Sequence, residues 1–262
     1  ITPAAANAVA EKLFGGWPTP KREPGIGSGY GSGIVGARPI VRKITVIDLP
    51  DSGQAAVNFY KPIIGVTRGS NQYYSASVLN SLLGGGYSSR LNQEIRIKRG
   101  LSYGAGSSFS WRRNRTNFSA RTQTKNESAP EVAELMIAEL KRLTDTDATE
   151  TELNPRRLVL TGGFGRNLET TGGLAAALSD LYSFGIAPSE LNAYMPGVTG
   201  VSSAAVKDFA AKNLFDGEMI IVGDYSIFKD DLAKRFPGMK IEVVKASELN
   251  IESPTLKKSD IP

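Results

Sequence analysis

The sequence predicts an α+β fold with two layers, a mixed β-sheet and a set of helices packed on one of its faces. Segments with the alternating pattern of half-buried strands occur in pairs, and other segments carry apolar residues at helical spacing on one side only. The predicted order is two strands, two helices, two strands, several helices and a final strand-helix-strand unit. Amphipathic helices bury their apolar side against one face of a sheet, and this packing gives a two-layer architecture.

The two ends of the chain are predicted to lie outside the main fold. Residues 1–14 have a helical pattern with Val9, Leu13 and Phe14 on one side, and residues 18–38 have the Gly-, Pro- and Ser-rich composition of a linker. We interpret residues 1–38 as the tail helix of a preceding domain plus a linker. Residues 39–250 then form the main domain, and the polar residues 251–262 form a loose tail.

The first half of the main domain is predicted to hold two strands, a helix, a glycine-rich loop and a short second helix. Gly100 stands where the short helix needs a residue with positive φ, and Leu91 and Ile95 give that helix an apolar edge. A serine hydroxyl oxygen or an asparagine amide oxygen can cap a helix start, because it accepts a hydrogen bond from an unpaired backbone N–H. The expected elements are strands 40–49 and 54–64, helix 70–83 capped by Ser70 or Asn71, and a helix that starts at Ser88 or Ser89.

The second half is predicted to begin with a hairpin of strands 103–111 and 116–124, in which Tyr103 opens the alternating run. Ser128 and Glu131 have the spacing of a capping box, which predicts a helix start there. The remaining expected elements are one or two helices in 149–184, a helix over 198–214 capped by Ser202 or Ser203, strand 219–224, helix 226–236 and edge strand 240–245.

The composition excludes several kinds of active site. The 262 residues include no histidine and no cysteine. A cysteine nucleophile, a Ser-His-Asp triad, a zinc finger and an HxxEH zinc motif are therefore impossible in this chain. No apolar run approaches the ~18 residues of a membrane-spanning helix, so no membrane segment is expected.

Three short motifs point to other chemistry but lack the context that this chemistry requires. Gly31 to Gly36 matches GxGxxG, yet it follows a Gly/Ser tract instead of a strand. Ser226 and Lys229 match SxxK without the accompanying SDN and KTG elements. Asp224 and the pair Asp230–Asp231 could bind magnesium, but no spaced set of ligands accompanies them. We therefore set all three aside.

The chain is basic, with a net charge of +5 and a pI near 9.3. A basic chain must be considered for nucleic-acid binding, but aromatic residues are not interleaved with cations on one face. The densest basic cluster is Arg112, Arg113 and Arg115, at an expected hairpin tip. This cluster is either solvated surface or a contact for an acidic partner or substrate.

Arg96 and Tyr103 are the candidate chemical groups. They lie seven residues apart across the sharp corner between the short helix and the strand, so a fixed cation and a phenol can lie close together. The preceding run Gly84, Gly85 and Gly86 allows the backbone to pass close to another group. That group is either a neighbouring helix or an extended peptide.

The run from Leu83 to Arg96, followed by Lys98, Gly100, Leu101 and Tyr103, resembles the second-half domain of the M16 metallopeptidases, the insulinase, pitrilysin and processing-peptidase family. The resemblance implies a LuxS/MPP-like metallohydrolase fold and a zinc-free subunit of a bacterial two-chain peptidase. It assigns Arg96 and Tyr103 to catalysis. We take Gly84, Gly85 and Gly86 as the candidate substrate-binding residues, from the close backbone approach that they allow. It implies no metal in this chain and a zinc ion in an HxxEH-bearing partner, as a heterodimer that encloses a peptide.

Two alternatives remain. A non-catalytic structural or assembly subunit would share the fold, and a basic nucleic-acid-binding module would use the positive charge. The resemblance favours the peptidase, with no nucleic acid and no membrane as partner. From the bacterial two-chain members of the family we expect a periplasmic location, otherwise a cytoplasmic one.

Overall fold

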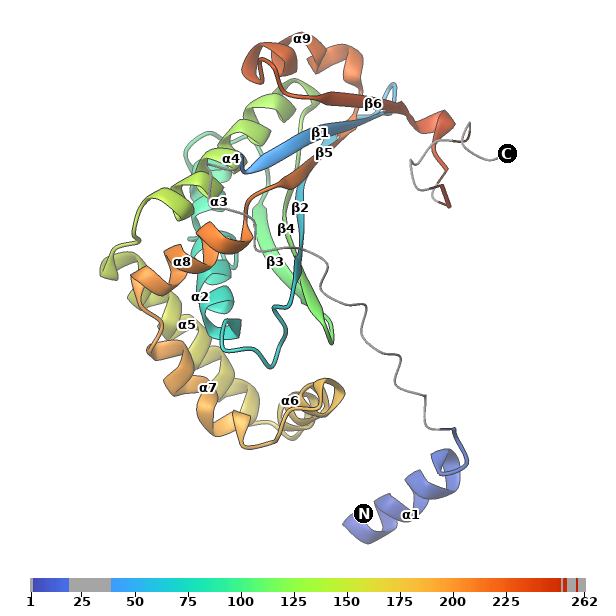
Figure 1. Cartoon of the computed structure of the whole chain (residues 1–262), viewed down its shortest axis with the longest axis vertical. Coiled ribbons are helices and arrows are strands. Elements are labelled where there is room, and N and C mark those ends of the chain that lie inside the picture. The colour runs from blue at the N-terminus through green and yellow to red at the C-terminus, as the bar shows by residue number, and fades with distance from the viewer. Residues whose placement is uncertain (1, 19–38, 251, 254–257, 259–262) are drawn as a thin grey trace. The chain divides into compact units, whose positions relative to one another are not determined.

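A computed structural model describes residues 2–18, 39–250, 252–253 and 258 (Figure 1). Helix α1 (Pro3–Phe14) belongs to a compact unit separate from the rest of the chain. The Thr2 hydroxyl accepts a hydrogen bond from the Ala5 amide at 3.3 Å and caps this helix. The predicted helix is therefore confirmed, and none of its side chains is buried within its own unit. The GxGxxG run lies outside the described residues.

The main unit is built on one six-stranded mixed sheet with the order β3-β4-β2-β5-β1-β6. Strands β3, β4, β2 and β5 pair antiparallel, whereas β1 runs parallel to both β5 and β6. The predicted mixed sheet and the predicted position of the last strand at an edge are confirmed. The strands are β1 (Val41–Asp48), β2 (Ala55–Ile64), β3 (Ala105–Trp111), β4 (Arg115–Thr124), β5 (Gly217–Gly223) and β6 (Ile241–Lys245).

Helices cover one face of this sheet, as Figure 1 shows, and the core lies between the two layers. Val57, Phe59 and Phe118 point from the strands into this core and are fully buried. Residues between them along the strands face the other side and stay partly exposed. The helices are α2 (Tyr73–Leu83), α3 (Arg90–Asn92), α4 (Ala129–Asp145), α5 (Glu150–Leu168), α6 (Thr171–Phe184), α7 (Glu190–Thr199), α8 (Ser203–Asn213) and α9 (Tyr225–Arg235).

The helix predicted over 198–214 is wrong in its first turn. The chain forms α7 and α8 there, and Gly200 to Ser202 separate them. The Ser202 hydroxyl accepts a hydrogen bond from the Ala205 amide at 3.1 Å, so this serine caps α8 as expected. Helix α7 has no counterpart among the predicted elements, and Pro196 lies inside it. An interior proline lowers the helix preference of a sequence, which is why the sequence does not predict this helix. Tertiary packing outweighs that preference here.

Two predicted caps are also wrong. Ser128 has helical backbone angles at the end of a short 3-10 turn, Asn126–Ser128, and makes no capping hydrogen bond. A capping box does form at the start of the next helix, α5, where it joins Thr149 and Glu152. Helix α2 begins at Tyr73 without a side-chain cap, because the Ser70 hydroxyl donates to the Thr67 carbonyl at 2.9 Å.

Candidate functional site

A hollow of about 410 Å³ lies where the end of α2, the short helix and the start of β3 meet. It brings Gly84, Gly85, Gly86 and Arg96 together, four of the five residues that the sequence singles out. The fifth, Tyr103, directly precedes Gly104 at its border. The lining residues are Gly84, Gly85, Gly86, Tyr87, Asn92, Arg96, Gly104 and Ala105.

The first two glycines of the run are required by packing within this chain. A Cβ atom at Gly84 would lie 2.2 Å from the backbone nitrogen of Ser107, and one at Gly85 would lie 2.8 Å from Cα of Ser81. The Gly84 carbonyl accepts a hydrogen bond from the Ser107 amide at 3.1 Å. Gly84 therefore lies against strand β3, not against a neighbouring helix. A Cβ at Gly86 would meet nothing within 4 Å, so its side faces open space.

The short helix that carries Arg96 is not a regular α-helix. Residues Arg90–Asn92 are α-helical and Gln93–Ile97 form a π-helical turn, in which the Lys98 amide donates to the Gln93 carbonyl at 2.9 Å. Gly100 ends this helix with φ +65°, as predicted, and the Leu101 amide donates to the Ile95 carbonyl at 2.9 Å. Neither predicted serine cap forms by side chain: Ser89 makes no capping hydrogen bond, and the Ser88 hydroxyl accepts from Arg156 at 2.8 Å.

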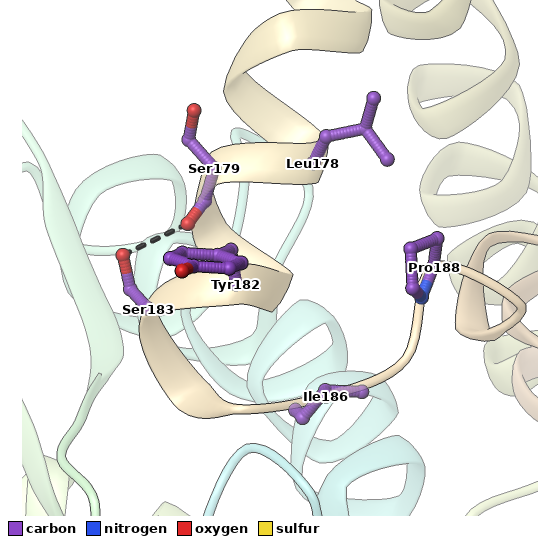
Figure 2. A pocket seen from close by; sticks show the side chains of 6 residues that line it. All are labelled: Leu178, Ser179, Tyr182, Ser183, Ile186 and Pro188. Atoms are coloured by element: carbon purple, nitrogen blue, oxygen red, sulfur yellow. Dashed lines mark hydrogen bonds between the residues drawn. The ribbon is translucent and has the colours of Figure 1, made fainter. Parts of the chain in front are cut away.

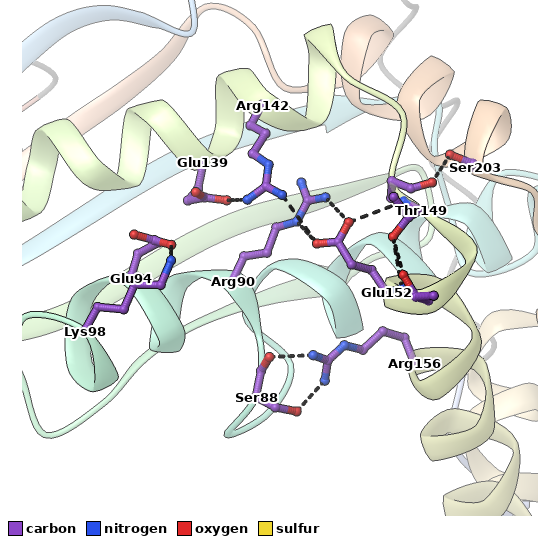
Figure 3. Close-up of polar contacts among 12 residues, drawn as sticks. Ser88, Arg90, Glu94, Lys98, Glu139, Arg142, Thr149, Glu152, Arg156 and Ser203 are labelled. Carbon is purple, nitrogen blue, oxygen red and sulfur yellow. Dashed lines mark hydrogen bonds and ion pairs between the residues drawn. The ribbon is translucent and has the colours of Figure 1, made fainter.

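A buried ion pair holds this helix against α5 (Figure 3). The Arg90 guanidinium donates to both Glu152 carboxylate oxygens, at 3.1 and 2.9 Å, and its side chain is 6% exposed. Arg142 lies 3.6 Å from the same carboxylate. Partial burial raises the pKa of Glu152, but the hydrogen bonds and charge of Arg90 outweigh it and lower the pKa overall. Arg90 is therefore a structural support of the short helix.

Arg96 is positioned by an aromatic ring. Its guanidinium carbon lies 5.0 Å from the centre of the Tyr87 ring, a cation–π distance. Tyr87 is 65% exposed and lines the hollow beside Arg96. This contact makes Tyr87 the ring that supports the candidate cation.

Tyr103 stands on a corner whose backbone is fixed while its phenol is free. The strand begins at Ala105, so the prediction that Tyr103 opens it is wrong by two residues. The Ser102 hydroxyl accepts from the Gly104 amide at 3.0 Å, and the Thr122 hydroxyl donates to the Gly104 carbonyl at 2.7 Å. These bonds turn the chain and leave the Tyr103 side chain 92% exposed.

Asn92 joins the parts of the site, and sequence reasoning misses it. Asn92 is only 4% exposed. Its side-chain nitrogen donates to the Tyr87 carbonyl at 2.6 Å, and its side-chain oxygen accepts from the Ala105 amide at 3.3 Å. One amide thus links the glycine-rich loop, the helix of Arg96 and the start of β3. In the sequence, the only sign of this role is that Asn92 is a polar residue directly after Leu91, on the apolar edge of the predicted helix.

The acidic cluster that includes Asp224 does not form a metal site in the described residues. Asp224 accepts hydrogen bonds from the Asp51 amide at 3.0 Å and the Ser226 amide at 3.1 Å, which makes it the cap of α9. Within the part of the chain that the structure describes, no group of three or more metal-binding side chains comes together. The helices of that part are also too short or too polar to cross a membrane.

A second hollow, of about 420 Å³, lies beside α6 (Figure 2). Its lining holds no charged side chain, and the Ser183 hydroxyl there is used within the helix, where it donates to the Ser179 carbonyl at 2.8 Å. It therefore offers an apolar surface rather than groups for chemistry, and the hollow at Arg96 remains the candidate site.

Comparison with known proteins identifies the family of this chain. The family model described as the peptidase M16 inactive domain matches residues 1–157. This chain belongs to the M16 inactive-domain family. An uncharacterized zinc protease of Streptomyces coelicolor is 33% identical over 110 residues, which is 42% of this chain and 24% of that protein. The chain thus spans about a quarter of the length of this curated relative.

Solved structures show the same M16 fold. A protease from Helicobacter pylori has a TM-score of 0.68 at 18% identity, over 85% of this chain and 53% of that one. A peptidase M16 inactive domain from Pseudomonas fluorescens has a TM-score of 0.63 at 24% identity, over 69% of this chain and 43% of that one. At these identities the likeness extends to the fold alone.

Proposed function

We propose that this M16 inactive domain completes the active site of a zinc-dependent peptidase whose metal is bound by another domain or subunit. Arg96 and Tyr103 act on the peptide substrate, and the backbone at Gly84, Gly85 and Gly86 contacts it. The zinc ion and the general base come from an HxxEH-bearing partner, which pairs with this chain as a heterodimer. We further propose a periplasmic location, on the basis of the resemblance alone.

The proposed chemistry is electrostatic. Hydrolysis of a peptide bond by an activated water places negative charge on the former carbonyl oxygen. A phenol O–H can donate a hydrogen bond to this oxygen, and a nearby guanidinium stabilises it through its charge. Neither group needs to transfer a proton. Donors that are already in position stabilise the transition state most effectively, because they do not have to reorganise during the reaction.

The state of Tyr103 supports this proposal best. A tyrosine kept for packing would bury its ring, as Phe118 does on the neighbouring strand. Tyr103 instead exposes 92% of its surface from a corner that three hydrogen-bonding side chains hold in place. It stands one residue from the hollow that Arg96 lines. An immobilised corner that presents a phenol to solvent suits a donor that acts on a molecule outside this domain.

The test is reconstitution. This chain is co-expressed with the HxxEH-bearing M16 polypeptide of the same organism, and the purified mixture is assayed with fluorogenic peptides. We expect zinc in the complex and cleavage only when both chains are present. A complex that forms and binds zinc, but whose cleavage rate does not depend on Arg96 or Tyr103, would instead indicate the non-catalytic assembly subunit.

A further inference from the structure

The whole excess positive charge of this protein lies in residues 101–125, which are the β3–β4 hairpin and the residues on either side of it. Residues 101–125 contain five basic side chains and no acidic one, while the rest of the chain contains 26 basic and 26 acidic side chains. The five are Arg112, Arg113, Arg115, Arg121 and Lys125. A hairpin with one sign of charge next to a site attracts ligands of the opposite sign.

The arginines of this hairpin have no counter-ions within the described residues. None of Arg112, Arg113, Arg115 and Arg121 has a carboxylate within 4 Å there. Seven other arginines do: Arg42, Arg68, Arg90, Arg99, Arg142, Arg157 and Arg235. Crowding like charges at a hairpin tip costs free energy unless something neutralises them. The guanidinium groups of Arg113, Arg115 and Arg121 are therefore available for a ligand, whereas that of Arg112 also donates to the Trp111 carbonyl at 3.5 Å.

Two of the cations, Arg115 and Arg121, sit on the sheet face opposite the helices. Arg115 and Arg121 alternate along β4 with buried residues and are both exposed. On the paired strand, Gly106, Ser108 and Ser110 stand opposite Arg121, Ser119 and Asn117. A Cβ on Gly106 would lie 3.1 Å from the carbonyl oxygen of Gly84, which lines the candidate site. The face therefore runs from the site to the tip with cations at both ends and small polar groups between them.

The tip itself is held rigidly, so its charges have fixed positions. The Arg112 amide donates to the Arg115 carbonyl at 2.8 Å, and the Gly65 amide donates to the Asn114 carbonyl at 3.2 Å. The Trp111 ring stacks on Phe109 at 5.5 Å and packs against Tyr73 at 5.0 Å. Because Trp111 is committed to this stack, it is not available to stack on nucleic-acid bases, which single-strand binders require.

We propose that the β3–β4 hairpin binds acidic residues of the peptide substrate at a fixed distance from the scissile bond. This inference rests on the proposed function, since the peptide is placed by Arg96 and Tyr103. Strand β3 rises by roughly 20 Å between Ala105 and Trp111, at about 3.4 Å per residue. An extended peptide has the same rise, so its acidic residues lie about six to eight residues from the bond that is cleaved.

Binding to the chain alone is the test, and it needs no cleavage. Fluorescence anisotropy measures the affinity of the purified chain for a labelled decapeptide with four Asp residues and for the same peptide with Asn in their place. We expect the acidic peptide to bind about tenfold more tightly or better, and its affinity to fall steeply with salt. Equal affinity for the two peptides would overturn the proposal.

A charge-matched pair of double variants locates the site. Arg113→Ala/Arg115→Ala removes two tip cations, whereas Arg166→Ala/Lys229→Ala removes two exposed cations from α5 and α9. We expect the first variant to weaken binding of the acidic peptide about fivefold or more and the second to leave it within about twofold. Equal loss in both variants, or tighter binding of a single-stranded oligonucleotide of the same charge, contradicts the proposal.

The same variants separate this inference from the proposed function. Binding of the acidic peptide to the chain alone and Tyr103-dependent cleavage by the assembled complex are measured separately. If acidic peptides bind at the tip but no zinc-bearing partner gives Tyr103-dependent cleavage, the function fails and the hairpin site stands. If cleavage depends on Tyr103 but is indifferent to acidic residues six to eight positions away, the hairpin proposal alone is wrong.

Discussion

The side-chain oxygen of Asn92 accepts a hydrogen bond from the backbone amide of Ala105 at 3.3 Å, thirteen residues further along the chain. The same side chain donates to the Tyr87 carbonyl at 2.6 Å. Its two ends therefore fix the loop that carries the ring beneath Arg96 and the strand that follows Tyr103. This amide therefore connects the two halves of the candidate site.

Replacing Asn92 with Leu should loosen the site while the fold persists. The buried Ala105 amide would lose its partner, at a cost of about 1–3 kcal/mol, and the Tyr87 carbonyl would lose its hydrogen bond as well. We expect faster hydrogen exchange at Ala105, and a lower kcat with little change in KM once the peptidase is assembled. Asn213→Leu, which removes an amide bonded to the Phe209 carbonyl on α8, is the control and should leave kcat unchanged.

The glycine run offers a pair of variants that separates packing from substrate contact. Gly84→Ala places a Cβ 2.2 Å from the Ser107 nitrogen and should destabilise the protein by about 1–3 kcal/mol, through displacement of β3. Gly86→Ala meets no atom within 4 Å and should not change the free energy of unfolding. Urea denaturation measures both. A Gly86→Ala protein that is fully stable but binds peptide more weakly would support the substrate contact, and unchanged peptide binding would count against it.

The Arg90–Glu152 pair makes a testable contribution to stability. Arg90→Ala should cost about 2–3 kcal/mol, less than a fully buried pair would, because the Glu152 side chain is 31% exposed. The pKa of Glu152 is lower in the folded protein than its ordinary value of 4.5. Its contribution is therefore fully present above pH 4.5 and is lost as the pH falls through the folded-state pKa. The stability difference between wild type and Glu152→Gln should shrink on acidification below pH 4.5, and a constant difference would contradict the assignment.

Glu139 should behave in the opposite way. Burial raises its pKa, and the charges of Arg142 and Arg90 only partly offset this effect. The ionised form is therefore less stable in the folded protein than in water. We expect Glu139→Gln to raise the melting temperature at pH 7, with a gain that disappears as the pH falls to about 4. A variant that is less stable than wild type at pH 7 would show that the ion pair with Arg142 outweighs the burial.

Sequence rules predict those features of the site that depend only on residues close together in the chain. Gly100 is predicted to have positive φ because a helix must end before a sharp corner, and it does. The cap at Ser202 follows from the same kind of rule. Ser128 fails because the chain already turns through Asn126–Ser128 before α4 begins. Asn92 could not be predicted, since its role depends on a strand thirteen residues away.

The measurement that most directly tests the central claim is the steady-state kinetics of Tyr103→Phe in the zinc-bearing complex. Tyr182→Phe serves as control, since this tyrosine is 87% exposed on α6 and has no proposed role in catalysis. Loss of one transition-state hydrogen bond typically costs about 2.7–4 kcal/mol, so we expect kcat to fall by at least tenfold with zinc content and assembly unchanged. An unchanged kcat for Tyr103→Phe would contradict the account.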